Sequence, residues 1–231
     1  MSEEIKAITM PGVHQKFLGY FSKNPLPEGA AVLDIGAGHG AFSKRLFDQG
    51  YNVSACDLFP ELFHFSEIPC EKVDITEPFP YPDHSFDGVV GIEVLEHILD
   101  HENFFRECDR ILKPGGKLYL STPNILSLKS RVRFLFRGFY YSFGPLEMDN
   151  HDGLQHICSR SLNQYNYIAR KYGLGDAHVE VDREQNSSKW QYIVMKPLIW
   201  ANSKIKKASN IHNKRKLLLG RVLFLTYFKP N

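Results

Sequence analysis

The most restrictive feature of this sequence is a cluster of three glycines, Gly36, Gly38 and Gly40, within the stretch VLDIGAGHGAFS at residues 32–43. An apolar run that ends at Asp34 precedes the glycines, and a pattern typical of a helix follows them. Glycine has no Cβ atom, so it allows a sharp turn and lets the backbone approach a ligand closely. The stretch therefore predicts a buried strand, a tight turn and a helix, with a ligand against the turn.

Strand and helix patterns alternate along the rest of the chain, and turn residues separate them. The expected strands cover residues 30–36, 51–57, 70–75, 85–94, 117–123, 179–184 and 221–229, and the expected helices cover residues 40–51, 101–113 and 159–173. This order predicts an open, twisted α/β sheet that is mostly parallel, with an antiparallel last strand and helices on both faces. A single domain is expected over residues 1–231.

Composition excludes several classes of protein. The four cysteines are far apart and form no C-x-x-C pair, which indicates reduced thiols and neither disulfides nor a zinc site. The acidic N-terminus lacks the apolar core of a secretory signal, and no run of 18 apolar residues predicts a membrane-spanning helix. We therefore expect a cytoplasmic protein, with contact to the inner face of a membrane left open.

Acidic residues stand at the ends of three successive expected strands. Asp34 closes the first strand, Asp57 the second and Asp74 the third. Ligands of parallel α/β sheets bind beyond the carboxyl ends of the strands, where a carboxylate can accept both hydroxyls of a ribose. A further carboxylate there can accept from an exocyclic amino group. The three residues together predict a pocket for an adenosine-like molecule, although each alone fits a helix cap or a turn.

The glycine spacing separates this pocket from two other nucleotide sites. It reads G-x-G-x-G, and Ala41 occupies the position of the third glycine in a dinucleotide fingerprint. No lysine occupies a P-loop position. The series VLDIGAGHG, CD, VDI, FDGVVGIEVLEH and ILKPGGKLYLSTPN resembles the class I S-adenosylmethionine-dependent methyltransferases, strongly over residues 30–125. The resemblance implies a Rossmann-like fold and S-adenosylmethionine as the cofactor.

The resemblance also assigns cofactor-binding roles by position. Asp34 would hold the amino end of the methionine part, and Asp57 the ribose hydroxyls. Asp74 would accept from the adenine amino group. The implied cofactor-binding set is Asp34, Gly36, Ala37, Gly38, Gly40, Asp57, Leu58, Asp74, Ile75 and Glu93.

Methyl transfer to a hydroxyl is helped by a base that removes the proton. His97, in VLEHI, is the first candidate because a histidine titrates in the useful range. His156 and His151 are the next candidates, because their stretch follows the fifth strand and should border the acceptor pocket. For each histidine, a purely structural hydrogen bond is the alternative.

A metal site is a second interpretation of the same region. If a helix begins there, Glu93, Glu96 and His97 fall at i, i+3 and i+4 on one face and suit a divalent ion. The ubiquinone-pathway O-methyltransferases, which the sequence also resembles, have such a cluster in the matching place. In the alternative, Glu96 and His97 only begin a helix, so the sequence leaves the metal unassigned.

Two stretches without acidic residues are unusual for such an enzyme. Residues 110–146 and residues 196–231 contain basic residues but no Asp or Glu, and six of the ten residues 134–143 are aromatic. We expect a lid insertion at 124–158 and a basic, aromatic-rich insertion at 186–220. The second insertion suits an anionic membrane surface or a homodimer contact. No RNA-recognition module is present, which argues against nucleic acid as the partner.

Two features indicate which kind of molecule accepts the methyl group: a missing motif and a further resemblance. The segment GIEVLEH replaces the Asn/Asp-Pro-Pro-Tyr-like motif expected for methylation of an amine in DNA. STPNILSL followed by an arginine-rich aromatic stretch resembles methyltransferases associated with surface glycans. We expect O-methylation of a small molecule, a sugar or a lipid-linked glycan. The alternatives are a soluble quinone or phenol O-methyltransferase with a divalent metal, and a non-catalytic protein that binds S-adenosylmethionine.

Overall fold

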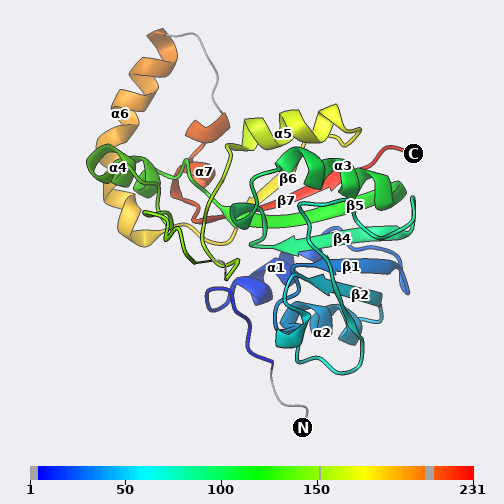
Figure 1. Ribbon diagram of the computed structural model, residues 1–231. Helices are drawn as coiled ribbons and strands as arrows, with labels where there is room; N and C mark the ends of the chain where they lie inside the picture. The colour runs from blue at the N-terminus through cyan, green and yellow to red at the C-terminus, as the bar shows by residue number, and fades with distance from the viewer. Residues whose placement is uncertain (1–4, 151, 206–210) are drawn as a thin grey trace.

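A seven-stranded sheet forms the centre of the computed structural model, which describes residues 5–150, 152–205 and 211–231 (Figure 1). The strand order is β3-β2-β1-β4-β5-β7-β6. β7 runs antiparallel to both of its neighbours, and the other pairs are parallel. The strands are β1 Ala31–Ile35, β2 Asn52–Asp57, β3 Cys70–Lys72, β4 Phe86–Ile92, β5 Leu112–Pro123, β6 His178–Val181 and β7 Val222–Phe228. The predicted Rossmann-like, mostly parallel sheet is confirmed.

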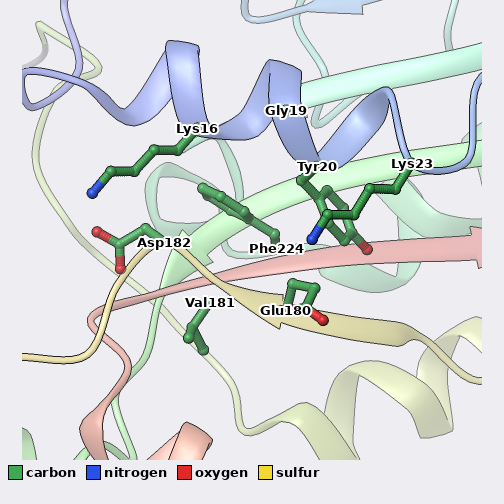
Figure 2. Close-up of a pocket in the computed structure, with 8 residues that line it drawn as sticks. All are labelled: Lys16, Gly19, Tyr20, Lys23, Glu180, Val181, Asp182 and Phe224. Carbon is green, nitrogen blue, oxygen red and sulfur yellow. The ribbon is translucent and has the colours of Figure 1, made fainter.

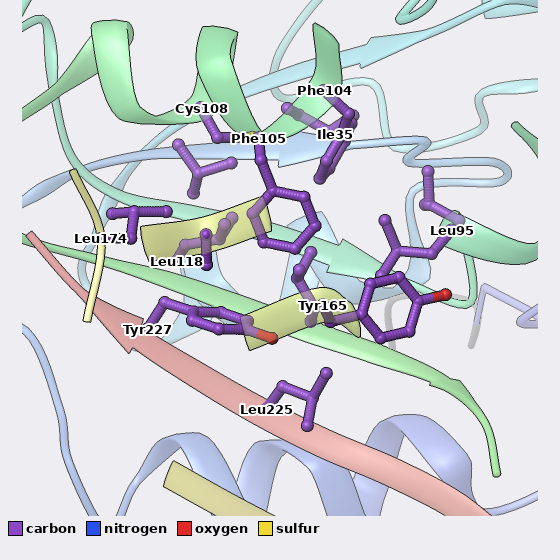
Figure 3. Close-up of a cluster of buried hydrophobic side chains, with 14 of the residues drawn as sticks. Ile35, Leu95, Phe104, Phe105, Cys108, Leu118, Tyr165, Leu174, Leu225 and Tyr227 are labelled. Atoms are coloured by element: carbon purple, nitrogen blue, oxygen red, sulfur yellow. The ribbon is translucent and has the colours of Figure 1, made fainter. Parts of the chain in front are cut away.

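Helices cover both faces of the sheet. On one face, α1 (Val13–Phe21) and α2 (Ala41–Asp48) pack their apolar side chains on β1, β4, β5 and β7. On the other face, α3 (His101–Ile111) and α5 (Leu162–Lys171) cover the sheet, and Phe105, Tyr165 and Tyr227 meet in the core between them (Figure 3). Alternate residues of each strand point to opposite faces, which accounts for the two separate apolar layers.

Local sequence signals explain where the helices begin. Asp100 accepts a hydrogen bond from the Asn103 N–H and caps α3. Ser161 caps α5 in a reciprocal pair with Gln164. One expected element is shorter than predicted: β3 ends at Lys72, and not at residue 75. The polar, exposed residues 71 and 72 at this sheet edge bury little that would extend the strand.

The two expected insertions contain helices that project from the sheet. After β5 comes α4 (Leu128–Arg137), and between β6 and β7 come α6 (Lys189–Ile205) and α7 (Arg215–Leu219). Figure 1 shows α6 at the margin of the molecule, beside α4. Single turns of 3-10 helix occur at Pro60–Leu62 (η1), Leu95–His97 (η2), Asn186–Ser188 (η3) and Ile211–Asn213 (η4).

The helices α4 and α6 lie outside the two core clusters. In α4, Leu128 is buried, whereas Leu135 and Phe136 are exposed. α6 contains Pro197, although proline usually ends a helix, so the local pattern does not indicate this helix.

Candidate functional site

The glycine-rich turn joins β1 to α2 at the carboxyl edge of the sheet. Gly36, Gly38 and Gly40 have φ angles of 66°, 53° and 82°, in the left-handed region that favours glycine. A Cβ atom at Gly36 would lie 2.6 Å from Cγ2 of Val94, and one at Gly40 would lie 2.7 Å from the ring of Phe63. Both the backbone conformation and the close packing therefore require glycine in this turn.

Asp34 is a buried carboxyl group near the end of β1. It is 2% exposed, and its Oδ2 atom accepts a 2.6 Å hydrogen bond from Oγ of Ser43 in α2. Burial raises the pKa of Asp34 to about 7, although the Ser43 hydrogen bond opposes the shift and the charge of Asp57 adds to it. A carboxylate in this environment is stabilised by a cationic partner.

Asp57 connects the end of β2 to the glycine turn. Its Oδ2 atom accepts from the Gly38 N–H at 2.8 Å, and its Oδ1 atom accepts from the Phe59 N–H at 2.9 Å. The carbonyl of Cys56 accepts from the N–H groups of Gly36 and Ala37, so the two strand ends are held together. Asp57 is half-buried and the next residue, Leu58, is 39% exposed. The carboxylate oxygens retain lone pairs for further donors.

The sequence predicted that Asp74 closes β3, but the strand ends two residues earlier. Asp74 is exposed, and its Oδ1 atom accepts from the N–H and the Oγ1 of Thr76 at 2.9 and 2.7 Å. This is an Asx turn, which the residue type favours by itself. Ile75 is half-buried and packs on the core beneath the turn.

Glu93 directly follows β4, but it does not begin a helix. Its φ angle is 54°, and its N–H donates to the carbonyl and to Oγ of Ser121. The carboxylate accepts from the backbone of Met10 and faces Arg221. Burial raises the pKa of Glu93, and the charge of Arg221 opposes that shift. The condition of the metal-site interpretation, a helix that contains Glu93, Glu96 and His97, is therefore not met, because Glu93 has a left-handed backbone and the turn begins at Leu95.

A different trio forms around the η2 turn. Glu96, His97 and His156 each present a donor atom, and these atoms lie within 4.8 Å of one another. The rings of His97 and His156 are 4.9 Å apart, edge to face. Glu96 is fully buried, and its Oε2 atom accepts from Thr122 at 3.2 Å. Its Oε1 atom has no hydrogen-bond partner among the described residues. Burial, with the charge of Glu93, raises the pKa of Glu96 well above its usual value.

The loop before α5 is fixed to the η2 turn by three hydrogen bonds. Nδ1 of His97 lies 3.0 Å from the carbonyl oxygen of Gln155. The carbonyl of Glu96 accepts from the N–H groups of Ile157 and Cys158 at 2.9 and 3.2 Å. Burial lowers the pKa of His97 and that of His156, so both are neutral at pH 7. The structure thus brings together two of the predicted histidines, while His151 lies outside the described residues.

A cavity of about 430 Å³ adjoins this histidine pair. His156 and Ile157 form one wall, and residues from α4 and the loop after it form the rest. The other lining residues are mainly apolar or aromatic: Phe134, Gly138, Phe139, Tyr140, Phe143, Gly144, Pro145, Leu146 and Met148. An apolar compound of moderate size fits the composition of this cavity.

A second, smaller cavity of about 200 Å³ lies between α1 and the β6 edge of the sheet. Figure 2 shows Lys16 and Lys23 on the α1 side and Glu180 and Asp182 on the β6 side. Charges of opposite sign thus face each other across it. Of the predicted site residues, none lines this cavity.

No pattern in the sequence indicates where the segment before α1 lies. Ile8 covers the glycine turn, since a Cβ atom at Gly38 would lie 2.9 Å from its Cδ1. The Lys6 carbonyl lies 3.0 Å from Nδ1 of His39. His14, on α1, packs edge to face on Phe42 at 5.6 Å. An irregular segment has no periodicity, so its position over the turn depends on tertiary contacts alone.

Comparison with known proteins places this site in a family. Residues 33–120 match the family described as methyltransferase domain. The ubiquinone biosynthesis O-methyltransferase of Xanthomonas axonopodis pv. citri is 37% identical over 116 residues, which cover 46% of this chain and 48% of that protein. The corresponding protein of Coxiella burnetii is 29% identical over 156 residues, or 64% of this chain and 66% of that protein. The chain spans about half the length of the first of these relatives.

Solved structures share the fold at low sequence identity. An S-adenosylmethionine-dependent methyltransferase from Archaeoglobus fulgidus superposes with a TM-score of 0.61 and 19% identity, covering 94% of this chain and 95% of that one. Phosphoethanolamine N-methyltransferase 2 of Haemonchus contortus also gives 0.61 at 19% identity, covering 97% of this chain and 54% of that one. At this identity the likeness establishes the architecture.

Proposed function

Because this chain belongs to the class I S-adenosylmethionine-dependent methyltransferases, we propose that it methylates a hydroxyl group of a small molecule with an apolar body. The proposal rests mainly on one arrangement: a neutral histidine, His97, held by its Nδ1 atom beside an apolar cavity. Named relatives that methylate oxygen in ubiquinone biosynthesis support the hydroxyl as acceptor.

The residues at the strand ends fit S-adenosylmethionine. The buried carboxylate of Asp34 suits its ammonium group, and the half-buried carboxylate of Asp57 suits its ribose hydroxyls. We assign the adenine to the side of Leu58, Asp74 and Ile75. The cofactor supplies an electrophilic methyl group on a positively charged sulfur. Gly36, Gly38 and Gly40 add no side chains of their own beside the cofactor.

His97 acts as the general base in this proposal. The carbonyl of Gln155 accepts a hydrogen bond, so Nδ1 of His97 carries the proton and Nε2 has a free lone pair. With the cofactor bound, Nε2 of His97 would take the proton that the acceptor hydroxyl loses when the methyl–sulfur bond breaks and the oxygen is methylated. His156 lies edge to face beside the ring of His97, and Phe143 packs against His156 in turn. Burial keeps His97 neutral before the transfer.

The acceptor class follows from the cavity. Of its lining side chains, only Tyr140 and His156 carry a polar atom, which disfavours a bare sugar and favours a phenol, a quinol or a lipid-linked compound. In this proposal an amphiphilic acceptor brings the protein to the inner face of a membrane. Among the described residues, no helix is both long and apolar enough to cross a bilayer.

A direct test supplies methyl-labelled S-adenosylmethionine with three acceptors: a catechol with an alkyl tail, the same catechol without the tail, and a free hexose. The tailed catechol should accept label best, because only its tail occupies the apolar cavity. Cofactor binding is measured in parallel by calorimetry. Cofactor binding without transfer to the acceptors or to a lipid extract of source cells would favour a non-catalytic binding protein.

A metal-assisted reaction is the second candidate, and the unpartnered Oε1 atom of Glu96 favours it. One carboxylate and two imidazoles within 4.8 Å suit a divalent transition ion such as manganese. In that case Glu96, His97 and His156 would hold the ion, and the ion would polarise the acceptor hydroxyl. Calorimetric titration with Mn²⁺ tests this directly. Binding should be lost in Glu96→Gln and kept in the matched surface variant Glu102→Gln.

A further inference from the structure

The helix α6 presents a broad apolar face to solvent, which we call the α6 face. Its six members are each between 60% and 81% exposed: Trp190, Ile193, Val194, Leu198, Trp200 and Ile205. At 100° per residue, these positions span about 160° of the helix circumference. Isolated exposed apolar residues are normal, but a contiguous face of this width marks an interaction surface.

The charges around the α6 face are all positive. Lys189, Lys196 and Lys204 lie on the helix, and α6 contains no acidic residue. The ammonium of Lys204 lies 5.9 Å from the ring of Trp200, and that of Lys196 lies 5.9 Å from the ring of Tyr192. The sequence has no Asp or Glu after Glu184, and the basic residues of the neighbouring α7, Arg215 and Lys216, are paired with Glu184 and Glu180. A partner for this surface is therefore both apolar and anionic.

We propose that α6 lies in the plane of an anionic lipid bilayer, with the α6 face inserted at the level of the headgroups. Tryptophan has an apolar ring and a polar N–H, and it is enriched at this depth. Lysine extends its stem along apolar surface and places its ammonium among the phosphates. A nucleic acid would use the charges but leave Ile193, Val194 and Leu198 in water. A second copy of the chain would bring together lysines of the same sign.

The neighbouring helix α4 adds to the same surface. Leu135 and Phe136 are 77% and 79% exposed, and α4 packs beside α6 (Figure 1). Phe134 and Phe139, at the end of α4, line the cavity next to His156. Docking through α6 therefore places the mouth of this cavity close to the bilayer. This last consequence rests on the proposed function, whereas bilayer binding itself does not.

The two tryptophans of the chain provide a direct test, because both belong to the α6 face. The full-length protein is mixed with phosphatidylcholine vesicles that contain roughly one third phosphatidylglycerol, and with vesicles of phosphatidylcholine alone. With the anionic vesicles we expect the fluorescence to move to shorter wavelength and to be quenched by brominated lipid. High salt should weaken the binding, since screening removes the lysine contribution.

Two pairs of variants separate the apolar and charged parts. Trp190→Ser with Trp200→Ser should reduce co-sedimentation with anionic vesicles at least tenfold, and Lys196→Glu with Lys204→Glu should reduce it on the order of fivefold per lysine. The matched control, Leu99→Ser with Tyr167→Ser, changes two residues that are 66% and 71% exposed elsewhere and should bind like the wild type. All these side chains are exposed, so the fold should survive.

Three results would overturn the proposal. The first is an unchanged fluorescence spectrum with both kinds of vesicle. The second is a shift to shorter wavelength that depends on protein concentration without lipid, which would assign the α6 face to a second copy. The third is tight binding to single-stranded RNA that vesicles do not displace. Because the readout is independent of methyl transfer, an inactive protein that still binds vesicles would contradict the proposed function alone.

Discussion

The Nδ1 atom of His97 lies 3.0 Å from the carbonyl oxygen of Gln155, a residue 58 positions later in the chain. This hydrogen bond joins the turn after β4 to the loop that forms one wall of the apolar cavity. It fixes the tautomer and the orientation of the imidazole in a single contact. The loop and the proposed base are therefore positioned together, and neither reaches this arrangement without the other.

We predict that His97→Asn lowers kcat by about a hundredfold or more, the range typical of a lost general base. The asparagine amide can still donate to the Gln155 carbonyl, so the loop should stay in place while the proton acceptor at Nε2 is lost. The affinity for S-adenosylmethionine should change little. Transfer of labelled methyl groups to the tailed catechol, with calorimetry for the cofactor, checks both parts.

The variant His156→Gln serves as the comparison. Its ring lies beside His97, and in the general-base mechanism it only packs against that ring, so we expect a loss of less than about tenfold. Equal losses in both variants, together with activity that depends on added Mn²⁺, would contradict the base role of His97 and favour the metal-assisted reaction.

Gly36 must be a glycine because of its left-handed backbone and because of its close packing. A second glycine, Gly29, allows the two effects to be compared. Gly29 has nearly the same φ, 70° against 66°, but a Cβ atom there would meet nothing within 4 Å. We expect Gly29→Ala to lower the free energy of unfolding by about 1 kcal/mol, the cost of a left-handed alanine. Gly36→Ala should cost more, because its Cβ lies 2.6 Å from Cγ2 of Val94.

Urea unfolding of both variants measures the difference, and cofactor titration shows whether the turn moves. If Val94 gives way by rotating its side chain, the two variants will be equally stable. In that case close packing does not account for Gly36.

The sequence predicted the parts of the site that local patterns determine. Asp34 and Asp57 follow apolar runs that form strands in almost any parallel sheet, so their place at the strand ends needs no long-range information. The helix over residues 101–111 follows from its cap at Asp100 and its apolar spacing. The sheet order then follows from a few topological rules.

The sequence did not determine where the histidine loop meets the strand ends. His156 reaches His97 through backbone contacts made by Glu96, and no spacing of residues encodes a contact over that distance. Only the metal-site interpretation required Glu93 to share a helix with Glu96 and His97, and a periodic pattern does not show that one residue has φ of 54°. The local pattern does not indicate α6, because the helix contains Pro197 and a proline within an apolar run usually marks the end of a helix.

Asp34 combines a proposed binding role with a cost in stability. Its pKa in the folded state is about 7, above the ordinary 3.8, so the folded protein binds a proton that the unfolded chain releases between these values. Stability therefore falls as pH rises from about 4 to 7, and the full penalty, roughly 4 kcal/mol, is present above pH 7. A cationic ligand beside the carboxylate offsets this penalty.

We predict that Asp34→Asn raises the free energy of unfolding at pH 8 by about 2 kcal/mol. Removing the buried charge stabilises the fold, but the new amide N–H lacks an acceptor, and this cost cancels part of the stabilisation. The gain should shrink as pH falls and change sign near pH 5, because the wild-type carboxyl is then protonated while the unpaired amide of the variant still costs about 2 kcal/mol. The affinity for S-adenosylmethionine should fall at least tenfold. Urea unfolding across this pH range, with calorimetry at pH 8, measures both effects. A variant less stable than wild type at pH 8 would contradict the buried-charge argument.

His14 should limit the stability of the protein in acid. It packs on Phe42, its Nδ1 atom has no hydrogen-bond partner among the described residues, and burial with the charge of Arg45 lowers its pKa to about 4. The unfolded chain binds a proton below pH 6.5, whereas the folded chain resists it until pH 4. Stability is therefore lost as pH falls through this window, by about 2 kcal/mol at pH 5.

We predict that His14→Phe reduces the loss in the free energy of unfolding below pH 6.5. The free energy of unfolding at pH 8 should be nearly unchanged. Phenylalanine keeps the edge-to-face contact with Phe42 and has no proton to gain. Thermal unfolding between pH 4 and pH 8 gives the comparison. The exposed residue His178 provides the control, and His178→Phe should lose stability in acid like the wild type. An equally steep loss of stability in acid for His14→Phe would assign the loss to other groups, of which His101, whose pKa burial also lowers, is the first to examine.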